Sequence, residues 1–129
     1  SAGGNSGTQA ASLIIRSLSL KEISSKDVLR VLQKELVIGV ILGGLLACIG
    51  FGRAVTWNLG TLTGVIIASS VVGVVLFGVI AGSMLPFLFE RFSIDPAVVS
   101  SPFISTLLDV MGIIIYINTA VFFMHTYSP

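Results

Sequence analysis

Charged residues are scarce in this sequence, and their scarcity excludes a water-soluble domain. Of its 129 residues, 10% are Asp, Glu, Lys or Arg. Soluble domains carry about 25% of these residues. Residues 36–52 and 54–89 contain no charged residue, and Asp109 is the only charged residue within 96–124. Because a helix needs roughly 20 predominantly apolar residues to cross a bilayer, we expect an integral membrane protein with three complete spanning helices.

Soft metal ligands and catalytic groups are equally scarce. Cys48 is the only cysteine and His125 the only histidine, so one chain can form neither a disulfide nor a zinc-type cluster. A formal net charge of +1 gives no basic surface for nucleic acid. No nucleophile–base pair or cofactor motif is present. We therefore expect neither enzymatic activity nor a nucleic-acid partner.

The hydrophobic pattern predicts an all-α integral membrane fold that forms one domain over residues 1–129. The last helix is expected to begin at Pro102, because proline is favoured in the first turn of a helix and disfavoured in its interior. The complete transmembrane helices are expected at 36–57, 62–89 and 102–124.

Two shorter segments precede the complete spans. Residues 1–20 carry polar side chains at helical spacing and predict a partial transmembrane helix. Residues 24–35 predict an amphipathic helix on the membrane surface. Ser24 and Asp27 have the spacing of a capping box, which would start this surface helix.

The basic residues predict how the chain is oriented in the membrane. Five of the seven Lys and Arg residues lie within residues 16–35, and Arg91 follows two crossings later on the same side. Arg53 alone lies on the opposite side. Since cytoplasmic loops are enriched in Lys and Arg, we expect a multi-pass protein of the cell (plasma or inner) membrane. Residues 16–35 would be cytoplasmic and the C-terminus outside.

Asp109 is a charged residue inside an expected spanning helix, where a charge costs free energy. It lies roughly 10 Å into the last helix at 1.5 Å per residue, where a carboxylate costs at least about 3 kcal/mol. No Lys or Arg lies within residues 36–52, 62–89 or 102–124 to neutralise it, so it must be protonated, bound to a cation or facing water. Ser101, Ser105 and Tyr116 fall near the same helical face. Such oxygen-rich surroundings suit Mg²⁺, which keeps several waters and takes one or two carboxylates.

The residues alone leave three roles for Asp109 open. It could bind a transported divalent cation, titrate in a proton-coupled cation carrier, or hydrogen-bond between the helices of a non-transporting membrane scaffold. The stretch Gly3–Gly7 could be a broken helix that presents carbonyl oxygens to an ion, or a flexible end. Two pairs of glycines at GxxxG spacing predict close helix packing: Gly39 with Gly43, and Gly78 with Gly82.

Three segments together resemble the MgtE family of magnesium transporters, which is related to solute carrier family 41. The stretch Gly3-Gly4-Asn5-Ser6-Gly7-Thr8-Gln9 with the following Leu13-Ile14-Ile15-Arg16 resembles the second transmembrane helix of the family. Met84-Leu85-Pro86-Phe87 resembles the end of the fourth helix. Asp95-Pro96-Ala97 through Ser100-Ser101-Pro102, then Thr106 and Asp109, resembles the fifth.

The resemblance implies a homodimer in the lipid bilayer, with five helices per subunit and a Mg²⁺ pore along the dimer axis. Residues 1–129 would then be a transmembrane ion-permeation domain, with the family's first helix and cytoplasmic Mg²⁺-sensing domains outside this sequence. The resemblance implies that Asp109 holds a largely hydrated Mg²⁺, the transported ion. Ser101, Ser105 and Asn5 would complete the metal site, Ser105 through its backbone carbonyl. Asparagine is common in the family where Ser101 stands.

Overall fold

The computed structural model describes residues 1–95 and 101–127, with the side chain of Ser101 left out. Every element in these ranges is helical, and three of the helices are long and apolar enough to cross a membrane. The elements are α1 (Ala2–Ser19), the 3₁₀ turn η1 (Ser25–Asp27), α2 (Val28–Thr56), α3 (Thr61–Arg91) and α4 (Ser101–Tyr127). The predicted all-α fold with three helices that can cross a membrane is confirmed. The connector residues 96–100 that carry part of the resemblance lie outside the described residues.

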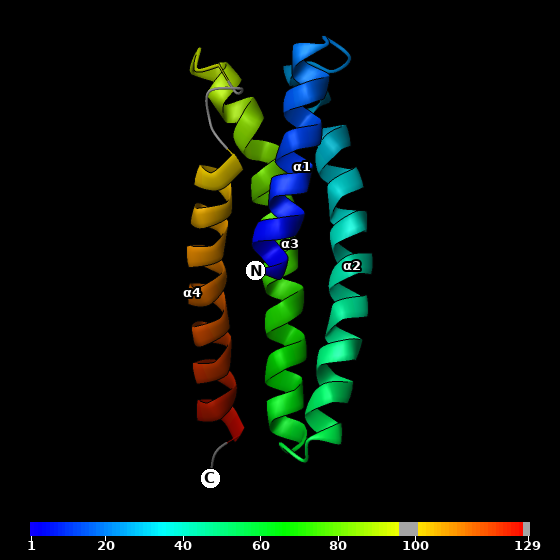
Figure 1. Ribbon diagram of the computed structural model, residues 1–129, viewed down its shortest axis with the longest axis vertical. Helices are drawn as coiled ribbons and strands as arrows, with labels where there is room; N and C mark the ends of the chain where they lie inside the picture. Colours follow the sequence, from blue (N-terminus) through cyan, green and yellow to red (C-terminus); the bar gives the residue numbers. More distant parts are fainter. Residues whose placement is uncertain (96–100, 128–129) are drawn as a thin grey trace.

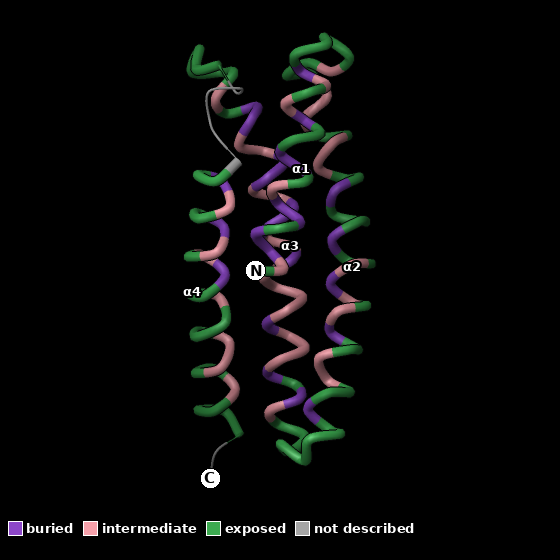
Figure 2. The backbone as a smooth tube through the Cα atoms, in the orientation of Figure 1, coloured by how far each residue is buried: buried purple, intermediate pink, exposed green. Residues whose placement is uncertain are grey.

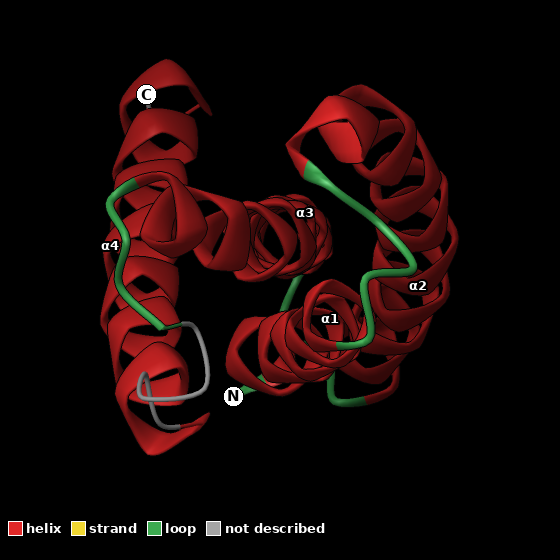
Figure 3. Cartoon of the chain, turned by 90° about the horizontal axis from the view of Figure 1, so that it is seen from above, coloured by secondary structure: helices red, strands yellow, loops and turns green. Residues whose placement is uncertain are grey.

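The helix α3 lies at the centre of the bundle. Seen from above, it stands between α2 and α4, and α1 packs beside it (Figure 3). The helix α3 runs the full height of the bundle and α2 and α4 run along most of it, whereas α1 begins about half-way along it (Figure 1). Burial is concentrated on α3 and on the start of α1, while the outer faces of α2 and α4 are exposed (Figure 2). These exposed faces are rich in Leu, Ile, Val and Phe, as expected for surfaces that meet lipid.

Glycines bring α1 and α3 into direct backbone contact. A Cβ placed on Gly78 would meet the carbonyl oxygen of Gly3, and one on Gly82 would meet the carbonyl oxygen of Gly7. Gly3 and Gly7 are one helical turn apart on α1, and Gly78 and Gly82 are one turn apart on α3. The two backbones therefore stay in contact over a full turn. The predicted close packing at the second GxxxG pair is therefore confirmed. Gly39, from the first GxxxG pair, also packs on α3. A Cβ placed on Gly39 would lie 2.7 Å from a side-chain carbon of Val79.

The structure differs from the sequence expectations in two segments. The stretch Gly3–Gly7 is neither a broken helix nor a flexible end but a regular part of α1, and its glycines provide close packing on α3. The segments expected at 24–35 and 36–57 are not separate helices. After the turn η1 they form the single helix α2, because residues 28–38 contain no Gly or Pro to interrupt it.

The helices α1, α2 and α3 end in the same backbone motif. The second residue beyond each helix adopts left-handed backbone, with φ of 57° at Lys21, 54° at Asn58 and 58° at Ser93. At the first of these ends, the N–H of Glu22 donates to the carbonyl of Ser17 at 3.0 Å. This pattern is the Schellman motif, in which glycine is the usual left-handed residue.

The two ends of the bundle differ in charge. The turn that leads into α2 and the last turn of α3 lie at the same end, and the α2–α3 turn and the C-terminus lie at the other (Figure 1). The basic residues of 16–35 and Arg91 therefore share one end. At the opposite end the guanidinium of Arg53 lies 4.2 Å from the centre of the Trp57 ring, a pairing suited to a membrane interface.

Candidate functional site

Asp109 on α4 lies against the first turn of α1. A Cβ on Gly4 would overlap Oδ1 of the Asp109 carboxylate, so this carboxylate touches the backbone of α1. The Asp109 side chain is 43% exposed, yet its Oδ1 is buried and has no hydrogen-bond partner. The carboxylate therefore has one enclosed oxygen, and its exposure lies on the Oδ2 side.

Asp109 lines a cavity of about 250 Å³. Its walls come from Ser1 and Ala2, the first residues of the sequence, from α3 and from α4, and it reaches Tyr116 two turns beyond Asp109. On α3 it is lined by Ser70, which is 1% exposed and whose Oγ has no hydrogen-bond partner. Sequence inspection missed Ser70, because one serine in an apolar run carries no signal of what it faces.

A second cavity, of about 460 Å³, lies between α1 and α4 and has mostly polar walls. It is lined by Asn5, Thr8, Gln9, Pro102 and Ser105. Two of the predicted site residues, Asn5 and Ser105, therefore share one cavity, whereas Asp109 borders the other. Gln9 lies one turn after Asn5 on the same helical face, as the polar spacing of residues 1–20 predicts. The side chain of the fourth predicted residue, Ser101, lies outside the described part.

The described residues offer a sparse set of cation ligands. Residues 1–95 and 101–127 contain no group of three His, Cys, Asp or Glu side chains that could hold a metal ion. One chain therefore presents the single carboxylate of Asp109 beside neutral oxygen donors. Such a set suits a hard cation that keeps most of its waters, or a site that a second carboxylate from another chain completes.

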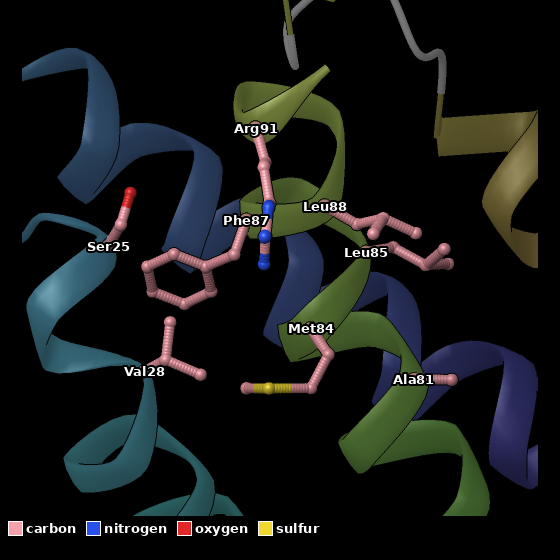
Figure 4. Close-up of a pocket in the computed structure, with 8 residues that line it drawn as sticks. All are labelled: Ser25, Val28, Ala81, Met84, Leu85, Phe87, Leu88 and Arg91. Carbon is pink, nitrogen blue, oxygen red and sulfur yellow. The ribbon is translucent and has the colours of Figure 1, made fainter.

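A third cavity, of about 570 Å³, lies between the start of α2 and the end of α3. Its labelled side chains are mostly apolar, and the Arg91 side chain runs back along α3 towards Met84 (Figure 4). No carboxylate lines it, so it lacks the ligands that a divalent cation needs. We therefore do not include this cavity in the candidate site.

Comparison with known proteins gives consistent matches along the chain. The family model MgtE, described as divalent cation transporter, matches residues 1–119. The magnesium transporter MgtE of Thermus thermophilus is 42% identical over 118 residues, which cover 92% of this chain and 26% of that protein. Proteins of the same name from Bacillus subtilis and Enterococcus faecalis are 30% and 33% identical, over 95% and 94% of this chain and 27% of each protein. The chain thus spans about a quarter of the length of these curated relatives.

Proposed function

Because this chain belongs to the MgtE family of divalent cation transporters, we propose that it conducts Mg²⁺ across the membrane and that Asp109 binds the hydrated ion. The observation that carries the proposal is the carboxylate of Asp109, which lies inside the apolar helix α4, while neither α4 nor residues 61–90 of α3 contain Lys or Arg. A bound cation would offset the cost of that charge. The family is one of transporters and not of enzymes.

A hydrated ion accounts for the neutral groups near Asp109. Mg²⁺ loses its water reluctantly and is commonly held through one or two carboxylates and several waters. The amides of Asn5 and Gln9 and the backbone carbonyl of Ser105 can accept or donate hydrogen bonds to such waters. We include Ser101, one turn before Ser105, in the same water-binding set. Selection would then depend on the fit of the hydrated ion to the cavity.

The polar face of α1 supports a pore between two subunits. Asn5, Gln9 and Ser12 are all exposed on the single chain, although α1 packs within a bundle of membrane-spanning helices. Polar side chains at this depth face water or another protein surface and not lipid. In a homodimer with twofold symmetry, this face would meet its own copy and bring two Asp109 carboxylates to the axis. The end of the bundle that carries residues 16–35 would be cytoplasmic, and the C-terminus outside.

Calorimetric Mg²⁺ binding by the detergent-purified protein tests the proposal. We expect Asp109→Asn to lose binding at least tenfold, and Glu22→Gln, which changes an exposed carboxylate in a turn, to bind as the native chain does. Ca²⁺ and Mn²⁺ serve as competitors. Undiminished binding in Asp109→Asn would overturn the assignment of the ion site.

Flux measurements separate the proposal from its two alternatives. In proteoliposomes, a Mg²⁺ conductor gives uptake driven by the Mg²⁺ gradient alone. A proton-coupled carrier would need a pH gradient, and Asp109 would then be the titrating group. A scaffold would give no flux in any variant, and Asp109→Asn would alter only its stability.

A further inference from the structure

A groove with mostly apolar walls lies at the end of the bundle that carries the basic residues of 16–35. It is the cavity of about 570 Å³ between the start of α2 and the end of α3, a size typical of ligand sites. Its polar lining residues are Ser25 and Arg91, and its apolar ones are Val28 and side chains of α3 between residues 81 and 88. No described residue of α1 lines this α3 groove. The groove is therefore separate from the ion site and from the first residues of the sequence.

The length of the α3 groove matches one leaflet of a bilayer. Ala81 and Arg91 both line it and lie ten residues apart on α3, which is roughly 15 Å at 1.5 Å per residue. Half of a hydrocarbon core of about 30 Å has the same length. Because Arg91 is the last residue of the spanning helix α3, the apolar part of the groove extends from the level of the lipid headgroups towards the middle of the bilayer. One acyl chain of a phospholipid occupies this depth.

The guanidinium of Arg91 has no partner within the described residues. In residues 1–95 and 101–127, no ion pair or hydrogen bond joins it to another residue. The neighbouring carboxylate of Glu90 accepts a hydrogen bond from the Ser25 hydroxyl at 3.4 Å and does not line the groove. The Arg91 side chain runs back along α3 towards Met84 (Figure 4), whereas long cationic side chains at the ends of spanning helices usually extend towards the water. An anion beside the guanidinium would offset the cost of this direction.

We propose that the α3 groove binds an anionic phospholipid, with one acyl chain along α3 and the phosphate on Arg91. Arginine donates paired hydrogen bonds to phosphate oxygens, and basic pockets between spanning helices bind anionic headgroups. Basic residues outnumber acidic ones by five to three within residues 16–35, so the charge at this end of the bundle also favours an anion. A soluble phosphate would use only the end of the groove at Arg91, whereas a phospholipid also covers the apolar side chains beyond it.

Native mass spectrometry of the detergent-purified protein, titrated with long-chain phosphatidylglycerol, measures the lipid that each variant binds. We expect Arg91→Gln to weaken binding about tenfold or more, the usual effect of removing hydrogen bonds to a charged group. Arg30→Gln is the matched control, because Arg30 is exposed at the same end of the bundle and does not line the groove. Arg91→Lys keeps the charge without the paired geometry and should bind with intermediate affinity. Equal losses in Arg91→Gln and Arg30→Gln would overturn the site, because they would show only general attraction to the basic residues.

A second variant tests the apolar part of the α3 groove. Ala81→Phe fills the end of the groove that lies farthest from Arg91 along α3. It should weaken the binding of long-chain phosphatidylglycerol and leave that of a short-chain form unchanged, since short chains do not reach residue 81. Equal binding of the long-chain lipid by Ala81→Phe and the native chain would contradict the placement of the acyl chain. Asp109 does not line the groove, so Asp109→Asn should keep the lipid, and the two proposals can fail separately.

Two further probes distinguish the possible occupants of the groove. Phosphatidylcholine should bind the native chain several times more weakly than phosphatidylglycerol, because its choline cation lies beside the phosphate. Excess glycerol phosphate, which has no acyl chain, should not displace the lipid. Displacement by glycerol phosphate would show a site for phosphate alone, and equal binding of the two lipids would show no recognition of headgroup charge. A native chain that binds no phosphatidylglycerol would leave the groove to a protein segment. Each of these three results would overturn the proposal.

Discussion

Gly4 of α1 and Asp109 of α4 are in contact so close that Oδ1 of the carboxylate occupies the space that a Cβ on residue 4 would need. The absence of a side chain on Gly4 thus determines where the carboxylate lies. The contact also places the carboxylate near the mid-height of the bundle, where α1 begins (Figure 1).

We predict that Gly4→Ala weakens Mg²⁺ binding at least tenfold, because the added methyl group pushes the Asp109 carboxylate away from α1. Gly44→Ala is the matched control, since a Cβ on Gly44 meets nothing within 4 Å. Calorimetric titration of both variants gives the comparison. Equal affinities in the two variants would contradict the idea that Gly4 sets the position of Asp109.

The contact between α1 and α3 gives a prediction on stability. A Cβ on Gly82 meets the backbone carbonyl of Gly7, which no side-chain rotation can relieve. We expect Gly82→Ala to destabilise the protein by about 1–3 kcal/mol, the usual cost of overpacking. Gly52→Ala places its methyl group in open space and should not lower the midpoint of thermal unfolding in detergent. A Gly82→Ala variant as stable as Gly52→Ala would show that the two helices separate at little cost.

The left-handed residue at the end of α1 predicts a stabilising substitution. Lys21 has φ of 57°, a conformation that costs a non-glycine residue roughly 1 kcal/mol or more. We therefore expect Lys21→Gly to stabilise the protein by about 0.5–1 kcal/mol. Lys34→Gly changes the same residue type within α2 and should destabilise it by about 0.5–1 kcal/mol. Both values come from thermal unfolding in one detergent, and shifts of the same sign would contradict the assigned backbone geometry.

Much of the fold could be predicted from charge alone. The spans expected at 62–89 and 102–124 correspond to α3 (Thr61–Arg91) and α4 (Ser101–Tyr127), because long uncharged runs that end at charged or turn residues define spanning helices. The expected break between 24–35 and 36–57 was absent, since a change from amphipathic to apolar composition does not interrupt backbone hydrogen bonding. Residues 28–38 contain no proline, the strongest helix breaker, to favour such a break.

The candidate site was less predictable, because its geometry depends on contacts between helices. Asp109 was evident from the sequence, as a carboxylate in an apolar helix always needs an explanation. The glycines from Gly3 to Gly7 suggested irregular backbone, since their partners on α3, Gly78 and Gly82, are remote in the sequence. The cavity that Ser70 shares with Asp109 likewise exists only once α3 and α4 are packed.

The final prediction concerns the proposed dimer. If the exposed polar face of α1 meets its copy at a twofold axis, a cysteine on that face should lie near its own mate. We expect Ser12→Cys, made in a Cys48→Ser background, to give a crosslinked dimer with a short bismaleimide reagent in membranes. The native chain is the control, because exposed Cys48 lies on α2, on the opposite side of α3 from α4 (Figure 3). We expect little crosslinking there, since that side faces lipid. Crosslinking at Cys48 but not at Ser12→Cys would move the interface to α2 and leave the polar face of α1 to another partner.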